Sequence, residues 1–205
     1  AISVTNSQNI VIDFNGHSIE SKVANEWFGL DIYLSTHIVV TNSVAGSSPS
    51  KIEGSYYNAG MRLYKSNHIS IKYLVFRGLG YGIDVYDSDE NTMEKIDVVG
   101  TNGRLEMGIR THRSQGNKIL GSRFSQLGTG MELTETYDST IQRNEIDETR
   151  NGIMLEAAHI KINENRFGLV KENDFADIFL LTPAQSLTIE KNEPENLKIK
   201  SQSKG

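Results

Sequence analysis

The chain of 205 residues contains no cysteine, which excludes a disulfide framework and a thiolate metal site. It has no apolar run long enough to predict a membrane span. No signal peptide begins at Ala1, which is compatible with a processed mature chain or a cytosolic one. Basic residues are in deficit, with 21 Lys and Arg against 26 Asp and Glu. A net charge of −5 disfavours nucleic-acid binding, because a phosphate-binding face normally shows a basic excess.

A short segment recurs six times along the chain. Each copy starts with a small or polar residue and continues with alternating apolar and polar ones, at residues 60–63, 82–85, 108–111, 130–133, 152–155 and 177–180. The steps between copies are 22, 26, 22, 22 and 25 residues. A period in the low twenties with alternating apolar residues predicts a solenoid whose coils stack through β-strands. A leucine-rich repeat fits less well, because the chain lacks a helical half and regularly placed leucines.

Each coil contains two further apolar positions, about ten and fifteen residues after the first. The first set contains Ile71, Met93, Ile119 and Ile141, and the second contains Phe76, Val98, Phe124 and Ile146. We therefore predict an all-β, single-domain right-handed parallel β-helix over residues 1–205, with coils of roughly 22 residues and three short strands in each.

The ends of the solenoid are expected to be less regular than its middle. Regular repeats cover about residues 57–192, irregular coils cover 1–56, and a polar cap covers 193–205. Residues 42–56 are predicted to form a loop that interrupts an N-terminal coil, and residues 197–199 a short strand within the cap. The polar cap is expected to stop the open sheet edge from pairing with another chain.

Alternation along the first strand of each coil places two ladders of side chains on the outer surface. One ladder contains Asp31, Arg62, Asp84, Arg110, Glu132, Met154 and Phe179. The other contains Tyr33, Tyr64, Tyr86, His112, Thr134, Glu156 and Leu181. The turns that follow contain Lys65, Asp87, Arg113 and Glu135.

These ladders have two interpretations. Opposite charges on adjacent strands stabilise a sheet, and tyrosine is a good strand former, so both ladders could serve the fold alone. Aromatic residues flanked by ionisable groups on a rigid strand surface also suit a sugar chain, with the rings stacking on its apolar faces. On the second interpretation, the substrate-binding residues are Tyr33, Tyr64, Arg62, Lys65, Asp87 and Glu132.

Two segments on consecutive coils resemble mannuronan C5-epimerases, a family of pectate-lyase-like parallel β-helices. Residues 81–87, YGIDVYD, resemble that family's Y-G-[FI]-D-P-H-[DE] segment, and residues 108–113, GIRTHR, resemble its G-I-x-V-x-R segment. The resemblance implies that Asp84 and Asp87 are the motif carboxylates, that Arg113 binds substrate, and that Tyr86 occupies the place of the catalytic histidine. Val85 and Tyr86 replace the motif proline and histidine, and His112 offers an imidazole one coil away.

This resemblance implies proton abstraction from C5 of a uronate in an acidic polysaccharide, followed by elimination in a lyase or reprotonation in an epimerase. Arg110 or Arg113 would neutralise the substrate carboxylate, and Tyr86 or His112 would move the proton. Asp84 completes the expected catalytic set. No cofactor is indicated, although Ca²⁺ could bind through Asp84 and Asp87. We expect an extracellular or periplasmic protein; its oligomeric state is left open.

Two alternatives remain from the residues themselves. Asp84 and Glu132 should lie about 9.5 Å apart, at the upper limit for an inverting glycoside hydrolase. Arg110 between them is expected to lower both pKa values, which disfavours a general acid. The other alternative is a non-catalytic glycan-binding or structural β-helix, of the tail-spike or adhesin type.

Overall fold

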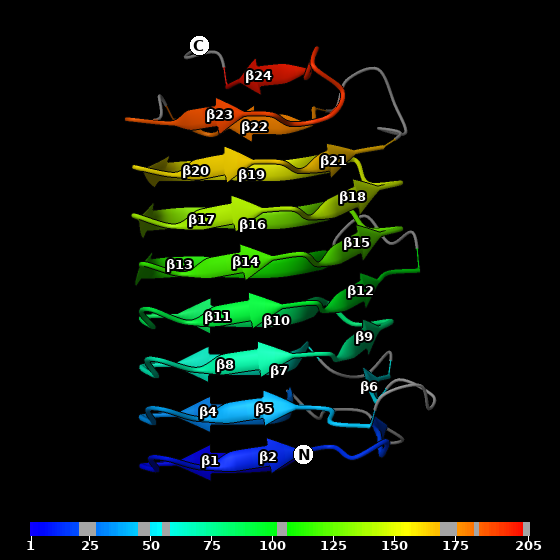
Figure 1. Ribbon diagram of the computed structural model, residues 1–205, viewed down its shortest axis with the longest axis vertical. Helices are drawn as coiled ribbons and strands as arrows, with labels where there is room; N and C mark the ends of the chain where they lie inside the picture. The colour runs from blue at the N-terminus through cyan, green and yellow to red at the C-terminus, as the bar shows by residue number, and fades with distance from the viewer. Residues whose placement is uncertain are drawn as a thin grey trace.

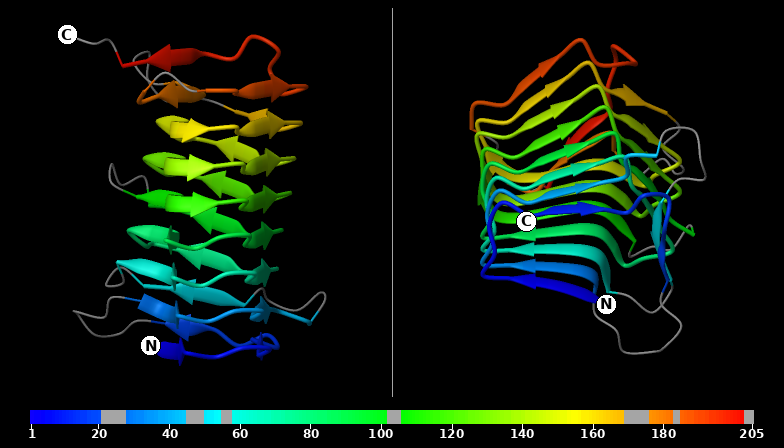
Figure 2. Two further views of the ribbon diagram at one scale, coloured as in Figure 1. Left: turned by 90° about the vertical axis from the view of Figure 1, so that its left-hand side faces the viewer. Right: turned by 60° about the horizontal axis from the view of Figure 1, so that its bottom comes forward.

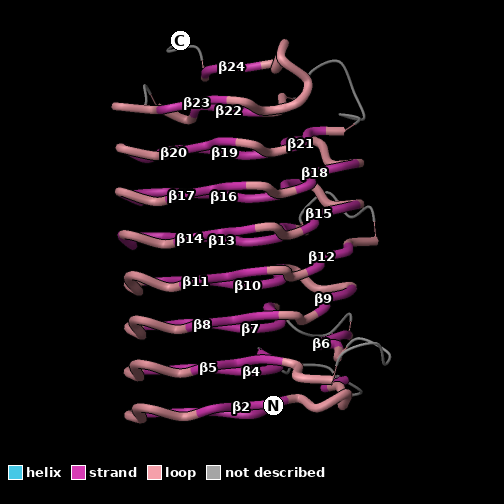
Figure 3. The backbone as a smooth tube through the Cα atoms, viewed as in Figure 1, coloured by secondary structure: helices cyan, strands magenta, loops and turns pink. Residues whose placement is uncertain are grey.

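A computed structural model of the chain describes residues 1–20, 28–44, 50–54, 58–101, 106–168, 176–182 and 185–202. In this part of the chain every regular element is a strand, and none is a helix (Figure 3). The strands stack coil upon coil along one axis, with the two termini at opposite ends (Figure 1). The described residues contain no helix long and apolar enough to cross a membrane.

Three parallel sheets form the walls of this parallel β-helix (Figure 2). The first sheet contains β1 (Ile2–Thr5), β4 (Phe28–Tyr33), β7 (Ala59–Tyr64), β10 (Tyr81–Tyr86), β13 (Met107–Gln115), β16 (Thr129–Tyr137), β19 (Asn151–Ala158), β22 (Ile178–Leu180) and β24 (Ile199–Ser201). The second sheet contains β2 (Val11–Asp13), β5 (Val39–Thr41), β8 (Ser70–Lys72), β11 (Thr92–Glu94), β14 (Lys118–Leu120), β17 (Thr140–Gln142), β20 (Lys161–Asn163) and β23 (Thr188–Glu190). The third sheet contains β3 (Ile19–Glu20), β6 (Lys51–Glu53), β9 (Val75–Arg77), β12 (Asp97–Val99), β15 (Arg123–Ser125), β18 (Glu145–Asp147) and β21 (Arg166–Phe167).

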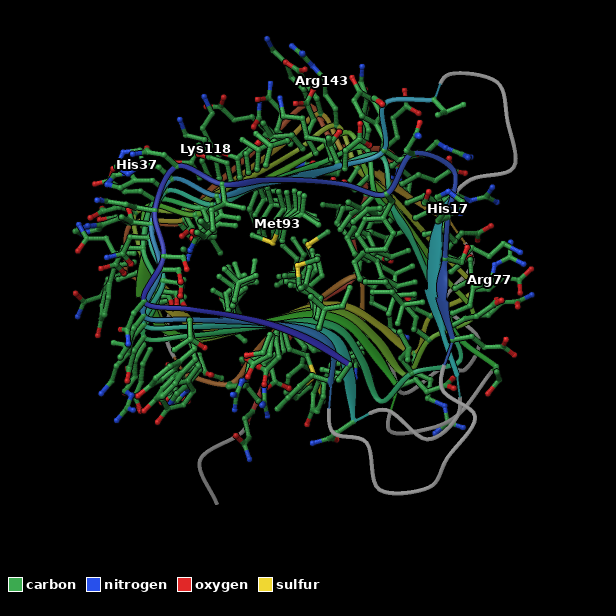
Figure 4. The ribbon with its side chains drawn as sticks, turned by 90° about the horizontal axis from the view of Figure 1, so that it is seen from below. His17, His37, Arg77, Met93, Lys118 and Arg143 are labelled. Carbon is green, nitrogen blue, oxygen red and sulfur yellow. The ribbon has the colours of Figure 1, made fainter. Side chains whose placement is uncertain are left out.

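The predicted repeat alignment is confirmed by the pairing of the first sheet. Six residues at the same place in the repeat pair in sequence along the axis and are fully buried: Met61, Ile83, Ile109, Met131, Ile153 and Ile178. Viewed along the axis, Met93 of the second sheet points into the same interior, whereas His37, Lys118 and Arg143 lie outside it (Figure 4). The core is therefore a narrow column that each coil fills from three sides.

A glycine opens most copies of the repeat because the neighbouring coil leaves no room for a side chain there. A Cβ atom added to Gly82 would lie 2.6 Å from the carbonyl oxygen of Gly108 and 2.7 Å from Val98 Cγ1. Contacts this short do not occur in real structures, so the glycine allows the close approach of adjacent coils.

Buried serine and asparagine residues link the coils where the chain turns between the first and second sheets. The amide of Ser66 donates to Ser88 Oγ at 3.0 Å, and the amide of Ser88 donates to Ser114 Oγ at 3.2 Å. Close by, the amide of Asn91 donates to Asn117 Oδ1 at 2.9 Å. These bonds satisfy turn amides that are shielded from water, which is otherwise costly.

The irregular ends differ from the sequence prediction in two places. Lys51–Glu53, inside the predicted loop 42–56, form strand β6, because Ile52 points into the core and is fully buried. Residues 45–49 and 55–57 of that loop lie outside the described part of the chain. The strand expected at 197–199 begins at Ile199 and extends the first sheet by pairing with β22.

Candidate functional site

The charged ladder runs from Asp31 to Phe179 on the outer surface of the first sheet, and its first five side chains form two ion pairs followed by one further acidic residue. These five side chains lie in register on consecutive coils. Arg62 binds Asp31 through Nε and a terminal nitrogen, at 2.8 and 2.7 Å. Arg110 binds Asp84 in the same two-pronged way, at 2.8 Å for both bonds. Glu132 follows Arg110 on the next coil.

An aromatic residue ahead of the repeat glycine supports each arginine of this ladder. The Arg110 guanidinium lies 4.2 Å from the centre of the Tyr81 ring and donates to the Tyr81 hydroxyl at 3.1 Å. Arg62 lies 4.1 Å from the centre of the Phe28 ring. The hydrogen bonds that Arg110 donates to Asp84 raise the pKa of Arg110, so its guanidinium stays charged and is held in one orientation. Sequence reasoning missed Tyr81 and Phe28 as site residues. Their signal in the sequence is an aromatic residue directly before a glycine, on the coil that precedes the coil of the arginine.

The aromatic ladder forms a continuous row of neighbouring rings. Ring centres lie 5.4 Å apart from Tyr33 to Tyr64, 5.4 Å from Tyr64 to Tyr86, and 5.0 Å from Tyr86 to His112. The first pair is stacked, with 20° between the ring planes, and the next two pairs are tilted by 50° and 30°. A hydrogen bond of 2.9 Å joins His112 Nδ1 to Thr134 Oγ1 at the end of the row. Within the row, each ring therefore packs against its neighbours.

A third row of charged groups lies at the ends of the first-sheet strands, each on a residue with positive φ. These residues are Lys65 and Asp87, directly after β7 and β10, and Arg113 and Glu135, inside β13 and β16, with φ between 47° and 50°. Asn6 and Leu34 have the same conformation at the equivalent places after β1 and β4, so it belongs to the repeated shape of the coil.

Arg113 of this row is held in place by two neighbouring side chains, Asp87 and Tyr86. It binds Asp87 through Nε at 2.9 Å, donates to the Tyr86 hydroxyl, and lies 4.4 Å from the centre of the Tyr86 ring. Lys65 lies over the ring of Tyr64 at 5.3 Å. The structure thus brings together all eleven side chains that the sequence predicts for the site, on five consecutive strands from β4 to β16 and the turns that follow them (Figure 1).

Glu132 differs from the other carboxylates of the site. It is half-buried, and among the described residues no ion pair or hydrogen bond holds its carboxyl group. Burial raises the pKa of Glu132, although Arg110 and His112 act in the opposite direction. The prediction that Arg110 gives Glu132 a lowered pKa is therefore wrong, because desolvation by burial outweighs the attraction of Arg110 and His112.

The carboxylates expected to bind Ca²⁺ do not fit a cation site. Asp84 faces Arg110 and Asp87 faces Arg113, so each carboxylate already has a positive partner. No group of three or more His, Asp or Glu suited to a metal ion is found within the described residues.

The sequence of this chain places it in a family defined by its fold. Residues 59–201 match the right-handed β-helix region, and the chain belongs to this family. The predicted fold, including its handedness, is confirmed. A comparison with curated proteins finds no match.

Solved structures with the same fold include enzymes that act on polysaccharides. The periplasmic alginate epimerase AlgG is 17% identical with a TM-score of 0.62, over 82% of this chain and 48% of AlgG. The enzymatically active domain of bacteriophage CBA120 tailspike protein 2 is 12% identical with a TM-score of 0.66, over 98% of this chain and 42% of that chain. Alginate lyase from Paenibacillus sp. FPU-7 is 13% identical with a TM-score of 0.58, over 91% of this chain and 78% of the lyase. At these identities the likeness concerns the fold alone, and the chain spans less than half of the first two proteins.

Proposed function

We propose that the chain acts on an acidic polysaccharide at the outer surface of β7, β10, β13 and β16, moving the C5 proton of a uronate unit as a lyase or C5-epimerase. The observation that carries this proposal is the gathering of proton-transfer groups and guanidinium groups on adjacent coils. Tyr86, His112 and Glu132 lie beside Arg110 and Arg113, and paired strands hold the whole set. A rigid strand surface positions such groups well for chemistry.

The arginines supply the positive charge that uronate chemistry requires. Removal of the C5 proton leaves a carbanion that is too unstable unless the neighbouring carboxylate is neutralised. Arg113 is the more accessible donor, with its side chain 46% exposed against 30% for Arg110. Both guanidinium groups keep N–H groups beyond those used by their aspartates. We assign carboxylate binding to Arg113 with support from Arg110, and assign Asp84 and Asp87 to positioning these arginines.

Three side chains are placed to move protons. His112 uses Nδ1 for Thr134, which leaves Nε2 for substrate. Tyr86 accepts a hydrogen bond from Arg113, which leaves its own hydroxyl proton for donation. Glu132 has a raised pKa and lies one coil beyond His112, so it can take up or release a proton nearer neutrality than an ordinary glutamate. A base removes the C5 proton; the electron pair then either expels the O4 substituent to form a C4–C5 double bond, or accepts a proton on the opposite face.

Two independent comparisons support this proposal. Residues 81–87 and 108–113 resemble the motif segments of mannuronan C5-epimerases. AlgG and the Paenibacillus lyase, which share the fold, are named for activities on alginate, a polyuronate. AlgG is also described as periplasmic, which supports an extracellular or periplasmic location for this chain.

The test is incubation of the protein with a panel of uronate polymers: alginate, polymannuronate, polygalacturonate and a glucuronan. Absorbance of the unsaturated uronate reports elimination, and loss of the C5 proton signal in heavy water reports epimerisation. We expect one of the two signals with at least one polymer. Neither signal with any of them would refute the proposed chemistry.

A non-catalytic glycan-binding role is the second candidate, and the closed Asp–Arg pairs are the observation that favours it. Arg62 and Arg110 already have carboxylate partners at 2.7–2.8 Å. Such pairs on adjacent strands stabilise the sheet and leave a charged surface for recognition without chemistry. Binding of a polymer in the panel without either chemical signal would select this role.

An inverting hydrolase is less well supported. Asp84 is only 7% exposed, and Arg110 engages both of its oxygens, so it has no free oxygen to activate a water molecule. The raised pKa of Glu132 suits a general acid, but its partner is not available as a base.

A further inference from the structure

Two adjoining hollows lie beside the proposed site, lined by residues at the ends of β13, β16 and β19. The first, of about 280 Å³, is lined by residues that include Arg113, Gln115 and Asp89. The second, of about 270 Å³, is lined by residues that include Glu156 and Ala158. Tyr137 and Glu135 line both hollows. Each hollow is smaller than a pocket for a drug-sized ligand and suits a single sugar ring.

Tyr137 is the aromatic side chain that stands between them. It is 49% exposed, and among the described residues no ring or cation packs against it. This distinguishes Tyr137 from the row of Tyr33 to His112, in which each ring packs against a neighbouring ring. Its partner on the following coil is Ala158, whose methyl group leaves the second hollow open beside the ring. Tyr137 therefore offers an exposed ring beside a hollow, on which a pyranose can stack.

A β-bulge lies at the acidic group of this corner. The pairing of β16 with β19 shifts between Thr134 and Thr136, so Glu135 is the extra residue of β16 on the side of β19, and it is exposed. Bulges often redirect a side chain next to a binding site. The carboxyl group of Glu135 is thereby shared by the two hollows.

The charges of the second hollow select against an anionic sugar. Glu135 and Glu156 line it, and no basic residue does among the described lining. Arg113 lines only the first hollow. A uronate in the second hollow would meet two acidic groups, whereas carboxylates readily accept hydrogen bonds from sugar hydroxyls.

We propose that Tyr137 is the stacking platform of an accessory subsite that takes a neutral pyranose. This inference rests on the proposed function, because it makes the substrate a mixed polysaccharide with neutral units next to the uronate that Arg113 receives. Arg113 and Tyr137 line the same hollow, so consecutive units of one chain would reach both.

The test is calorimetric titration with six neutral hexasaccharides (of mannose, xylose, glucose, galactose, arabinose and rhamnose), with hexamannuronate as the anionic probe and chitosan hexamer as the cationic probe. Tyr137→Phe keeps the ring, Tyr137→Ala removes it, and Ala158→Leu fills the space beside it. Tyr73→Ala is the matched control, since Tyr73 is a similarly exposed tyrosine, at 46%, on another corner of the coil. We expect a neutral hexasaccharide to bind wild type, Tyr137→Phe and Tyr73→Ala alike, and to bind Tyr137→Ala and Ala158→Leu about tenfold more weakly.

Three results would overturn this inference: no neutral hexasaccharide binds, binding is unchanged in Tyr137→Ala, or the binding that depends on Tyr137 belongs to the anionic or cationic probe. The proposed chemistry fails separately. If uronate polymers remain unaltered while neutral binding still depends on Tyr137, the subsite stands, and the proposed action of Arg113 and its neighbours on a uronate is refuted.

Discussion

At the scale of single residues, the site is governed by which charges already have partners. Asp84 and Asp87 each form an ion pair with an arginine. Glu132 is half-buried and forms no ion pair among the described residues. Position on the ladder alone would make Asp84 and Glu132 equivalent acids. Their partners make Asp84 a support for Arg110 and leave Glu132 as the carboxyl group that can change its protonation.

Glu132→Gln tests this difference through stability. Because the folded-state pKa of Glu132 is raised above its ordinary value of 4.5, the wild type loses stability as pH rises from the ordinary pKa through the folded pKa. The melting temperature of Glu132→Gln should therefore rise relative to wild type over this window, and the two should converge at lower pH. Met154→Leu, on the same ladder without a titratable group, should show a difference that does not vary with pH. A Glu132→Gln difference that is flat, or that shrinks as pH rises, would contradict the assignment.

At the scale of the strand, the fold depends on strict alternation between the core and the surface. Ile119 and Lys118 are neighbours on β14, and they face opposite sides of the sheet: Ile119 is buried and Lys118 is exposed. Alternation of this kind made the strand positions predictable, because a slip of one residue would exchange the two faces.

Paired substitutions to aspartate measure this alternation. Ile119→Asp should lower the free energy of unfolding by about 4 kcal/mol or more, because it buries an unpaired charge in a thin core. Lys118→Asp should change it by less than about 0.5 kcal/mol. Chemical denaturation of the two variants gives both values, and similar losses would show that the inward and outward positions are misassigned.

The turns between the first and second sheets depend on side chains that the periodicity did not reveal. Ser88 accepts a hydrogen bond from the amide of Ser66 and donates one to the carbonyl oxygen of Tyr86 at 2.8 Å. Ser88→Ala should cost about 1–3 kcal/mol of unfolding free energy, because it leaves a buried amide without a partner. Ser70→Ala, at a partly exposed position of β8, is the control and should cost much less. Equal losses of unfolding free energy for the two variants in urea denaturation would show that the hydrogen bonds of Ser88 do not stabilise this turn.

At the scale of the whole molecule, the repeat in the sequence was sufficient to predict the fold and the rows of side chains. The steps between copies located the internal row from Met61 to Ile178 and both outer ladders. Sequence could not show that Arg110 forms hydrogen bonds with Asp84 or that the rings of the aromatic row pack against one another. Nor could it show that a β-bulge lies at Glu135. These features depend on side-chain conformation and local register, which the repeat period does not determine.

The ends of the molecule were less predictable for a related reason. Strand β6 is short and lies between segments without the repeat pattern, so its single buried residue, Ile52, gave too weak a signal. Strand β24 joins the first sheet through pairing with β22 rather than through its own alternation. Short strands at the ends of a solenoid owe their position to the neighbouring coil.

The central claim is that Arg113 and its neighbours act on a uronate at the outer surface of the first sheet. Its most direct test is the initial rate of C5-proton loss or of elimination, on the polymer that the wild type alters fastest, compared between Arg113→Ala and Phe179→Ala. Phe179 lies on the charged ladder but far along the axis. Arg113→Ala should lower the rate at least about a hundredfold, because a developing oxyanion loses a charged donor. Phe179→Ala should keep the wild-type rate, and full activity in both variants would place the site elsewhere on the molecule.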